Sequence, residues 1–208
     1  MTTATMPTDS SPALALGALI TEQGATPRRV SDFLDSLSED DRVAATRSLG
    51  RGAQSKLWRL VDGFGELTLD HFVPKGAPVF EPVRHYGRNT LPAFVLFEKR
   101  FYRMGDGSSI GGANFNPTFI QGITGPGYFV TREDKNTREV LVDYHTVPTE
   151  KPADWPAIKR NEVGLSRFVY GFMIDRMRRV STQVTIGRAN RNGQDMSTWF
   201  TLCRKDAP

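Results

Sequence analysis

Two hydrophobic patterns follow each other in the last quarter of the chain. Within residues 162–180 the apolar side chains recur every three to four residues, which is typical of a helix with one buried face. They are Leu165, Phe168, Val169, Phe172, Met173, Met177 and Val180. After Ser181 the period becomes two, and Asn192-Gly193 is a pair typical of a hairpin turn. The pattern predicts an amphipathic C-terminal helix that covers a sheet, followed by a closing hairpin.

The middle of the chain is rich in strands. Residues 94–102 are apolar on both alternating faces, which predicts a strand inside a sheet. Residues 127–133 and 139–147 predict a second hairpin, in which Val140, Val142 and Tyr144 form the buried face. Few helical patterns separate these strands. We therefore predict an α+β fold with a mainly antiparallel, curved or barrel-like sheet.

The first third of the chain predicts short helices. Thr26-Pro27 is a capping side chain followed by proline at the first helical position, and Ser38 precedes three acidic residues that favour a helix start. A third short helix is predicted for residues 53–61. We divide the chain into a disordered tail at 1–12, an N-terminal helical region at 13–63 and a sheet-rich α+β domain at 64–208.

The composition is that of an ordinary globular protein, with 38% hydrophobic and 24% charged residues. Cys203 is the single cysteine, so no internal disulfide can form, which fits a reducing compartment. The longest apolar run, residues 13–20, falls far short of the roughly 20 residues that cross a bilayer. These features predict a cytoplasmic protein without a membrane span.

Charge and motifs exclude several classes of function. The formal net charge of +4 equals that of residues 162–208, which hold eight Lys and Arg against four Asp and Glu. A nucleic-acid binder usually carries a denser basic stripe, so this charge argues against nucleic acid as a partner. The three histidines lack metal-ligand spacing, and no nucleotide motif is complete. We therefore predict no metal and no cofactor, and we assign no catalytic residue.

Arg176 is a candidate ligand-binding residue because the helical pattern places it in the apolar stripe. A charge moved into a core must be paired, or it costs several kcal/mol. Three interpretations stay open. The side chain reaches water from the last turns of the helix, it pairs with an acid such as Glu98 or Asp143, or it anchors an anion in a cavity.

The other candidates come from polar clusters next to aromatic segments. Arg84 and His85 follow a proline-bounded stretch, and their side-chain donors together suit an anionic group. The alternative interpretation is that they lie in a surface turn. Asp143 and His145 share one face of a predicted strand, which is typical of an acid–base pair, of two metal ligands or of a solvent-exposed face. The seven candidate ligand-binding residues are Arg84, His85, Arg100, Tyr128, Asp143, His145 and Arg176.

Three hypotheses about function follow. The leading one is a small-molecule binding protein that holds an apolar or lipid-like ligand with an anionic group between sheet and helix. The second is a structural module that binds a protein partner through its N-terminal helices and its basic C-terminal part. The third and weaker one is a cyclase or hydrolase on a barrel scaffold, which uses Asp143, His145 and a cavity arginine.

Overall fold

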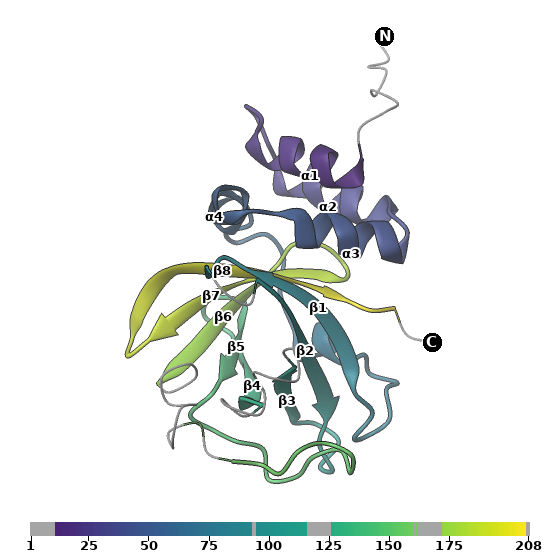
Figure 1. The fold of residues 1–208 in the computed structure, drawn as a ribbon, viewed down its shortest axis with the longest axis vertical. Coiled ribbons are helices and arrows are strands. Elements are labelled where there is room, and N and C mark those ends of the chain that lie inside the picture. The colour runs from purple at the N-terminus through teal and green to yellow at the C-terminus, as the bar shows by residue number, and fades with distance from the viewer. Residues whose placement is uncertain (1–10, 93–94, 116–125, 160, 162–171, 207–208) are drawn as a thin grey trace.

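The computed structural model describes residues 11–92, 95–115, 126–159, 161 and 172–206. In these ranges five helices precede eight strands (Figure 1). The helices are α1 (Pro12–Thr21), α2 (Pro27–Ser36), α3 (Glu39–Ser48), α4 (Arg51–Leu60) and α5 (Leu69–Phe72). The strands are β1 (Val83–Asn89), β2 (Leu96–Arg103), β3 (Ile110–Phe115), β4 (Tyr128–Asp134), β5 (Glu139–Asp143), β6 (Met173–Arg179), β7 (Val184–Arg191) and β8 (Gln194–Arg204).

The eight strands form one closed antiparallel barrel. Each strand pairs with the next one in the sequence, and β8 pairs with β1 to close the barrel. The closing ladder sets Gly87 opposite Leu202. The prediction of an α+β fold with an antiparallel, barrel-like sheet is confirmed. Closure also leaves no sheet edge open to pair with another chain.

The prediction of a C-terminal covering helix at residues 162–180 is wrong over residues 173–179. Residues 173–179 form β6, which pairs with β5 on one side and β7 on the other. Residues 162–171 of that predicted helix lie outside the described residues. On β6 the side chains of Asp175 and Met177 are buried, whereas Arg176 and Arg178 lie on the other face. The side chains of β6 therefore alternate with the period of two that is typical of a strand. The ladders with β5 and β7 stabilise this strand, although the same residues also fit a helical pattern.

Helices α1 to α4 form a helical cap on the outside of the barrel (Figure 1). The side chains of Thr26 and Ser38 accept hydrogen bonds from backbone N–H groups at the starts of α2 and α3, as the sequence predicted. Helix α3 packs on β1 and β8, and α4 packs on β7 and β8. Residues of the cap and of the strands share one apolar core, which includes Leu34, Leu57, Trp58, Val184, Ile186 and Cys203.

Three phenylalanine side chains of the barrel interior lie against glycines of the neighbouring strand. The cross-strand pairs are Gly87 with Phe97, Gly112 with Phe129, and Gly187 with Phe200. A Cβ atom at any of these glycines would lie 2.2–2.6 Å from ring atoms of its phenylalanine. Each ring therefore occupies the space that a side chain would take, and glycine is required by this close approach.

Residues 64–82, which we call the plug, place Leu67, Phe72 and Val73 in the interior core at one end of the barrel. Phe72 of α5 is fully buried and stacks near Phe101, with 4.7 Å between ring centroids. Arg103 Nη2 donates to the carbonyl oxygen of Val73 at 2.8 Å, and Arg204 donates to that of His71. These bonds tie the plug to β2 and β8.

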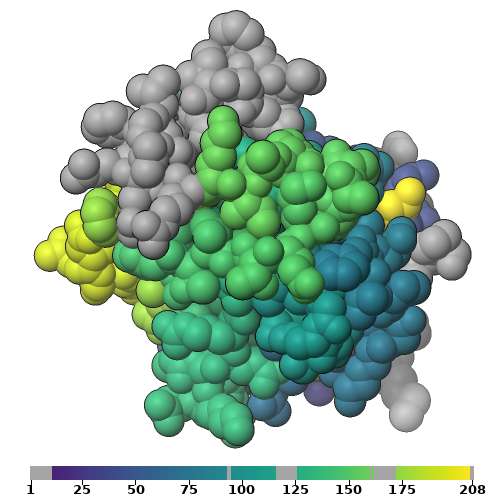
Figure 2. All heavy atoms as spheres, turned by 90° about the horizontal axis from the view of Figure 1, so that it is seen from below, coloured from purple at the N-terminus to yellow at the C-terminus, as the bar shows by residue number. Residues whose placement is uncertain are grey.

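A second outer core lies over β2, β3 and β4. Residues 147–158, which we call the strap, cross this face of the barrel (Figure 2). Trp155 of the strap is 5% exposed and packs against Tyr102, with ring centroids 5.2 Å apart. The barrel therefore carries apolar cover on its outside in two places, while its interior forms a core of its own.

Candidate functional site

The barrel interior holds a buried polar group that we call the lysine cluster: Lys99, Asn114, Tyr144 and Asp175. Lys99 Nζ donates to Asp175 Oδ2 at 2.8 Å and also to the Tyr144 hydroxyl. Asn114 Nδ2 donates to the same hydroxyl at 3.0 Å, and Tyr144 Oη lies 3.3 Å from Asp175 Oδ2. Strands β2, β3 and β6 and the end of β5 thus bring their polar side chains to one point.

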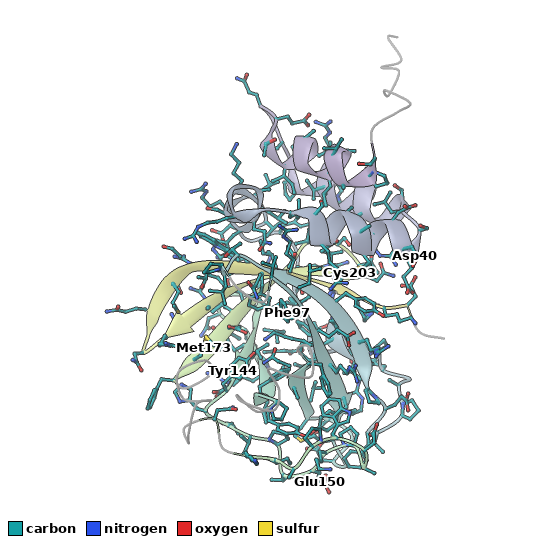
Figure 3. All side chains as sticks on the ribbon, viewed as in Figure 1. Asp40, Phe97, Tyr144, Glu150, Met173 and Cys203 are labelled. Atoms are coloured by element: carbon teal, nitrogen blue, oxygen red, sulfur yellow. The ribbon has the colours of Figure 1, made fainter. Side chains whose placement is uncertain are left out.

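Aromatic rings surround the ammonium group of Lys99. Its Nζ lies 4.8 Å from the ring centroid of Phe200, 4.9 Å from that of Tyr144 and 5.1 Å from that of Phe129. Such distances allow cation–π attraction, which is strongest where water is excluded. Figure 3 shows Tyr144 and Phe97 within the outline of the barrel, below the helical cap. The lysine cluster is therefore a small group of polar side chains surrounded by aromatic rings.

The lysine cluster is almost fully removed from water. The side chains of Lys99 and Asp175 are 2% and 5% exposed. Burial lowers the pKa of Lys99 below its ordinary value, and the neighbouring Asp175 opposes that shift. A lysine with a lowered pKa exposes its nitrogen lone pair more often, so the amine can act as a base or a nucleophile.

His85 lies on the interior face directly opposite Lys99 in the β1–β2 ladder. Its Nε2 donates to the carbonyl oxygen of Phe72 in the plug at 3.0 Å. That bond leaves Nδ1 as an acceptor, and this buried atom has no hydrogen-bond partner among the residues that the structure describes. Burial lowers the pKa of His85 to about 3, so its ring is neutral at pH 7.

The lysine cluster lies toward the barrel end that faces away from the plug. Lys99 is near the start of β2, Asn114 is next to the last residue of β3, and Tyr144 directly follows β5. His85 lies between this group and Phe72 of the plug.

The predicted arginine candidates of β1 and β2 lie outside the barrel. Arg84 and Arg100 both approach Glu98, at 3.6 Å and 2.9 Å. The guanidinium carbon of Arg100 is also 4.0 Å from the ring centroid of Phe115. On these strands the odd-numbered residues point inward, so both arginines belong to the outer face.

Arg176 also lies on the outer face of its strand, not in an apolar helical stripe. Its Nε donates to Glu139 Oε2 at 2.7 Å, and its Nη1 lies 3.4 Å from Asp195. Its acidic partners are thus Glu139 and Asp195 instead of Glu98 or Asp143. Glu139 also accepts from Arg178 at 2.7 Å, so two arginines neutralise one buried carboxylate.

The remaining candidates also lie outside the lysine cluster. Tyr128 belongs to the core under the strap, where its hydroxyl donates to the carbonyl oxygen of Pro156. The predicted strand 139–147 ends at Asp143, whose Oδ1 accepts from the backbone N–H of His145 at 2.9 Å. His145 is exposed. Asp143 therefore stabilises a turn, and His85 alone of the seven candidates reaches the barrel interior near Lys99.

Sequence reasoning missed Lys99, Asn114, Tyr144 and Asp175 as a site. Tyr144 was predicted to be buried, and this is confirmed because it is 3% exposed. The available signal was the alternation in 96–103, where Phe97, Lys99 and Phe101 share one face. A lysine between two phenylalanines on the inner face of a strand indicates a buried amine that needs a partner.

Comparisons with protein-family models, with curated proteins and with solved structures gave no match to this chain. Among the described residues, no helix is both long and apolar enough to span a membrane. In the same part of the chain, no group of three or more His, Cys, Asp or Glu side chains could hold a metal ion. The candidate site therefore stands on its own geometry.

Proposed function

We propose that the protein binds a small, mostly apolar molecule inside the barrel, with a polar oxygen of that molecule at the lysine cluster. The observation that carries the proposal is the buried Lys99–Asp175 pair among aromatic rings. A buried ion pair is often no better for stability than apolar residues of the same volume. A strongly desolvated charged group is more often found where a protein binds or reacts.

Charge balance narrows the chemistry of the ligand. Asp175 neutralises Lys99, and His85 carries no charge at pH 7. Arg84, Arg100 and Arg176, which suggested an anionic ligand, pair with Glu98 and Glu139 on the outer face. The proposed ligand is therefore neutral at its polar end, with a carbonyl or hydroxyl oxygen that accepts from Lys99 or Tyr144. A hydroxyl on the ligand could also donate to His85 Nδ1.

The alternative of a partner-binding module has less support. It rested on the N-terminal helices and the basic C-terminal part, and apolar side chains of those helices are buried in a core that they share with the barrel strands. The cyclase or hydrolase alternative rested on Asp143, His145 and a cavity arginine. The carboxylate of Asp143 accepts from a backbone N–H group, and Arg176 pairs with Glu139 on the outer face. A ligand-binding barrel accounts for the lysine cluster, which neither alternative uses.

Titration with Nile red, a neutral apolar dye, tests the proposal. The purified protein should enhance the fluorescence of the dye with a saturable stoichiometry of one per chain. Val142 lies on the inner face opposite Asp175, so Val142→Phe should block binding, whereas Leu141→Phe on the outer face of the same strand should not. Circular dichroism checks that both variants fold.

Two results would contradict the proposal. One is a wild-type protein that gives no saturable enhancement, and the other is equal binding by the two folded variants. A second experiment needs no variant: organic extraction of freshly purified protein, followed by mass spectrometry, detects any compound that co-purifies with it. A co-purified neutral apolar compound that competes with Nile red would support binding in the barrel.

A further inference from the structure

We propose that Lys99 binds its ligand covalently, as an imine formed with an aldehyde or ketone. This inference rests on the proposed function, because the carbonyl compound must first enter the barrel. Lys99 differs from the other lysines in its surroundings. All seven lysines lie in the described ranges, and Lys99 is the buried one, whereas Lys75, for example, has an 87% exposed side chain.

Burial of Lys99 raises the share of its amine that is neutral and can react. An amine attacks a carbonyl carbon only through its free lone pair, and exposed lysines are protonated at pH 7. Burial removes water from Lys99, which disfavours its charged form and lowers its pKa, although the neighbouring Asp175 opposes that shift. Desolvation is a recognised way to activate a lysine for imine formation.

The first step joins the amine to the carbonyl carbon. The neutral Nζ forms the C–N bond, and the electron pair of the C=O π bond moves to the oxygen. One proton then passes from nitrogen to that oxygen through the Tyr144 hydroxyl, which lies within hydrogen-bond distance of Nζ. The product is a carbinolamine. Asn114 donates to the same hydroxyl at 3.0 Å and so holds it in position as a relay.

The second step expels water. In the neutral form of the pair, the shared proton is on Asp175, and this carboxyl group protonates the hydroxyl of the carbinolamine. The C–O bond breaks, water leaves, and the nitrogen lone pair forms the C=N bond. The protonated imine then faces the Asp175 carboxylate, which was 2.8 Å from Nζ, and the three rings stabilise its cation. Carbonyl compound and amine give imine and water, with no change of oxidation state.

Reductive trapping tests this chemistry directly. The protein is incubated at pH 7 with 2-naphthaldehyde and sodium cyanoborohydride, which reduces an imine to a stable secondary amine. Mass spectrometry of the intact chain and of its peptides then locates each adduct. We expect one adduct at Lys99, formed about 10²-fold faster than any adduct at Lys75, because positioned acid–base groups typically contribute that much.

Variants separate the roles of the residues. Lys99→Met should remove the fast adduct, and Lys75→Arg, the matched control on the surface, should keep it. Asp175→Asn and Tyr144→Phe should slow trapping at Lys99 by about 10²-fold and flatten its dependence on pH, since each removes a proton-transfer group. Circular dichroism on every variant identifies any that fails to fold. The comparison of labelling at Lys99 and Lys75 in the wild-type protein does not depend on the variants.

The test distinguishes failure of this inference from failure of the proposed function. If the wild-type protein binds Nile red but Lys99 is labelled no faster than Lys75, imine formation is overturned and non-covalent binding stands. If the protein neither binds Nile red nor labels at Lys99, both proposals fall. Fast labelling at Lys99 that Nile red suppresses would support both.

Discussion

The core under the helical cap and the barrel interior are both built from buried side chains, but they differ in how their buried charges are paired. The core under the helical cap is built from apolar side chains such as Leu34, Leu57 and Trp58. Its buried Arg42 reaches an aspartate, Asp206, whose side chain is 45% exposed. In the barrel interior, both members of the Lys99–Asp175 pair are buried.

This difference separates stability from function. Burial of apolar surface explains why the helical cap packs on β7 and β8, at roughly 25 cal/mol per Å². The same argument does not explain an ion pair in a barrel that apolar side chains could fill. Because desolvation of the pair costs several kcal/mol, the comparison supports the proposal that the interior binds or reacts with a ligand.

The sharpest way to test the comparison is to remove the ion pair in two steps. Lys99→Met leaves Asp175 buried without its cation and should lower the free energy of unfolding by about 3–5 kcal/mol. The double variant Lys99→Met/Asp175→Leu should recover most of that loss, since an apolar pair replaces a desolvated one. Urea unfolding measures both. A double variant as unstable as the single one would show that the pair itself stabilises the barrel.

In the helical cap, truncation of one buried apolar side chain should lower the free energy of unfolding, and no second substitution is expected to recover that loss. Leu57 is fully buried between α4 and the barrel, and Leu57→Ala should lower the free energy of unfolding by about 2–5 kcal/mol. Trapping at Lys99 should stay at the wild-type rate under conditions where the variant is folded. A change in that rate would show that the two regions are coupled.

Acid should destabilise the barrel through His85. The folded pKa is lowered to about 3 against an ordinary value of 6.5, so below pH 6.5 the unfolded chain binds a proton that the folded chain does not. Stability is complete above pH 6.5 and falls toward pH 3, by up to about 1.4 kcal/mol per pH unit for each such histidine. His71, whose pKa burial also lowers, adds in the same direction.

His85→Phe isolates the contribution of this histidine. Urea unfolding between about pH 6 and pH 5, where ordinary carboxylates remain ionised, should show a smaller slope for the variant than for the wild type. An unchanged slope would mean that His85 is protonated in the folded barrel.

The smallest expected effect concerns the glycines that face phenylalanines. A Cβ at Gly112 would lie 2.4 Å from ring atoms of Phe129 and 2.6 Å from the carbonyl oxygen of Arg100, so the backbone itself must shift. Gly112→Ala should therefore destabilise the protein by about 1–3 kcal/mol. Thermal or urea unfolding measures this loss.

The matched control for this glycine lies in the helical cap. Gly17 is inside α1, and apart from its chain neighbours and the backbone of its own helix no atom lies within 4 Å of its Cβ position. Gly17→Ala should raise stability by about 0.5–1 kcal/mol, because alanine loses less backbone entropy in a helix. Equal destabilisation by both substitutions would contradict the close-packing argument.

Local signals in the sequence were sufficient for much of the fold. Thr26 and Ser38 cap the helices that follow them, and Asn192-Gly193 joins β7 to β8. The hairpin of β4 and β5 was also recognised, although β5 ends at Asp143. Each of these features depends on residues close together in the chain, so composition and spacing are enough to predict them.

The sequence failed where two periodicities fit the same residues. Met173 and Met177 are four apart, which suits a helical face, yet they also lie on one face of a strand. Which pattern holds depends on the partners on either side, β5 and β7, since their ladders supply the backbone hydrogen bonds of β6. The misplacement of Arg176 followed from that single choice.

The sequence by itself determined the caps of α2 and α3, the Asn192-Gly193 turn, the hairpin of β4 and β5 and the mainly antiparallel sheet, because these follow from interactions between near neighbours. From the sequence Arg100 was the candidate, and the alternation of Phe97, Lys99 and Phe101 was not used. Only closure of the barrel brought Lys99 to its partner Asp175, 76 residues later. The pKa of this amine is lowered because it is desolvated, and desolvation requires strands from distant parts of the chain to enclose it.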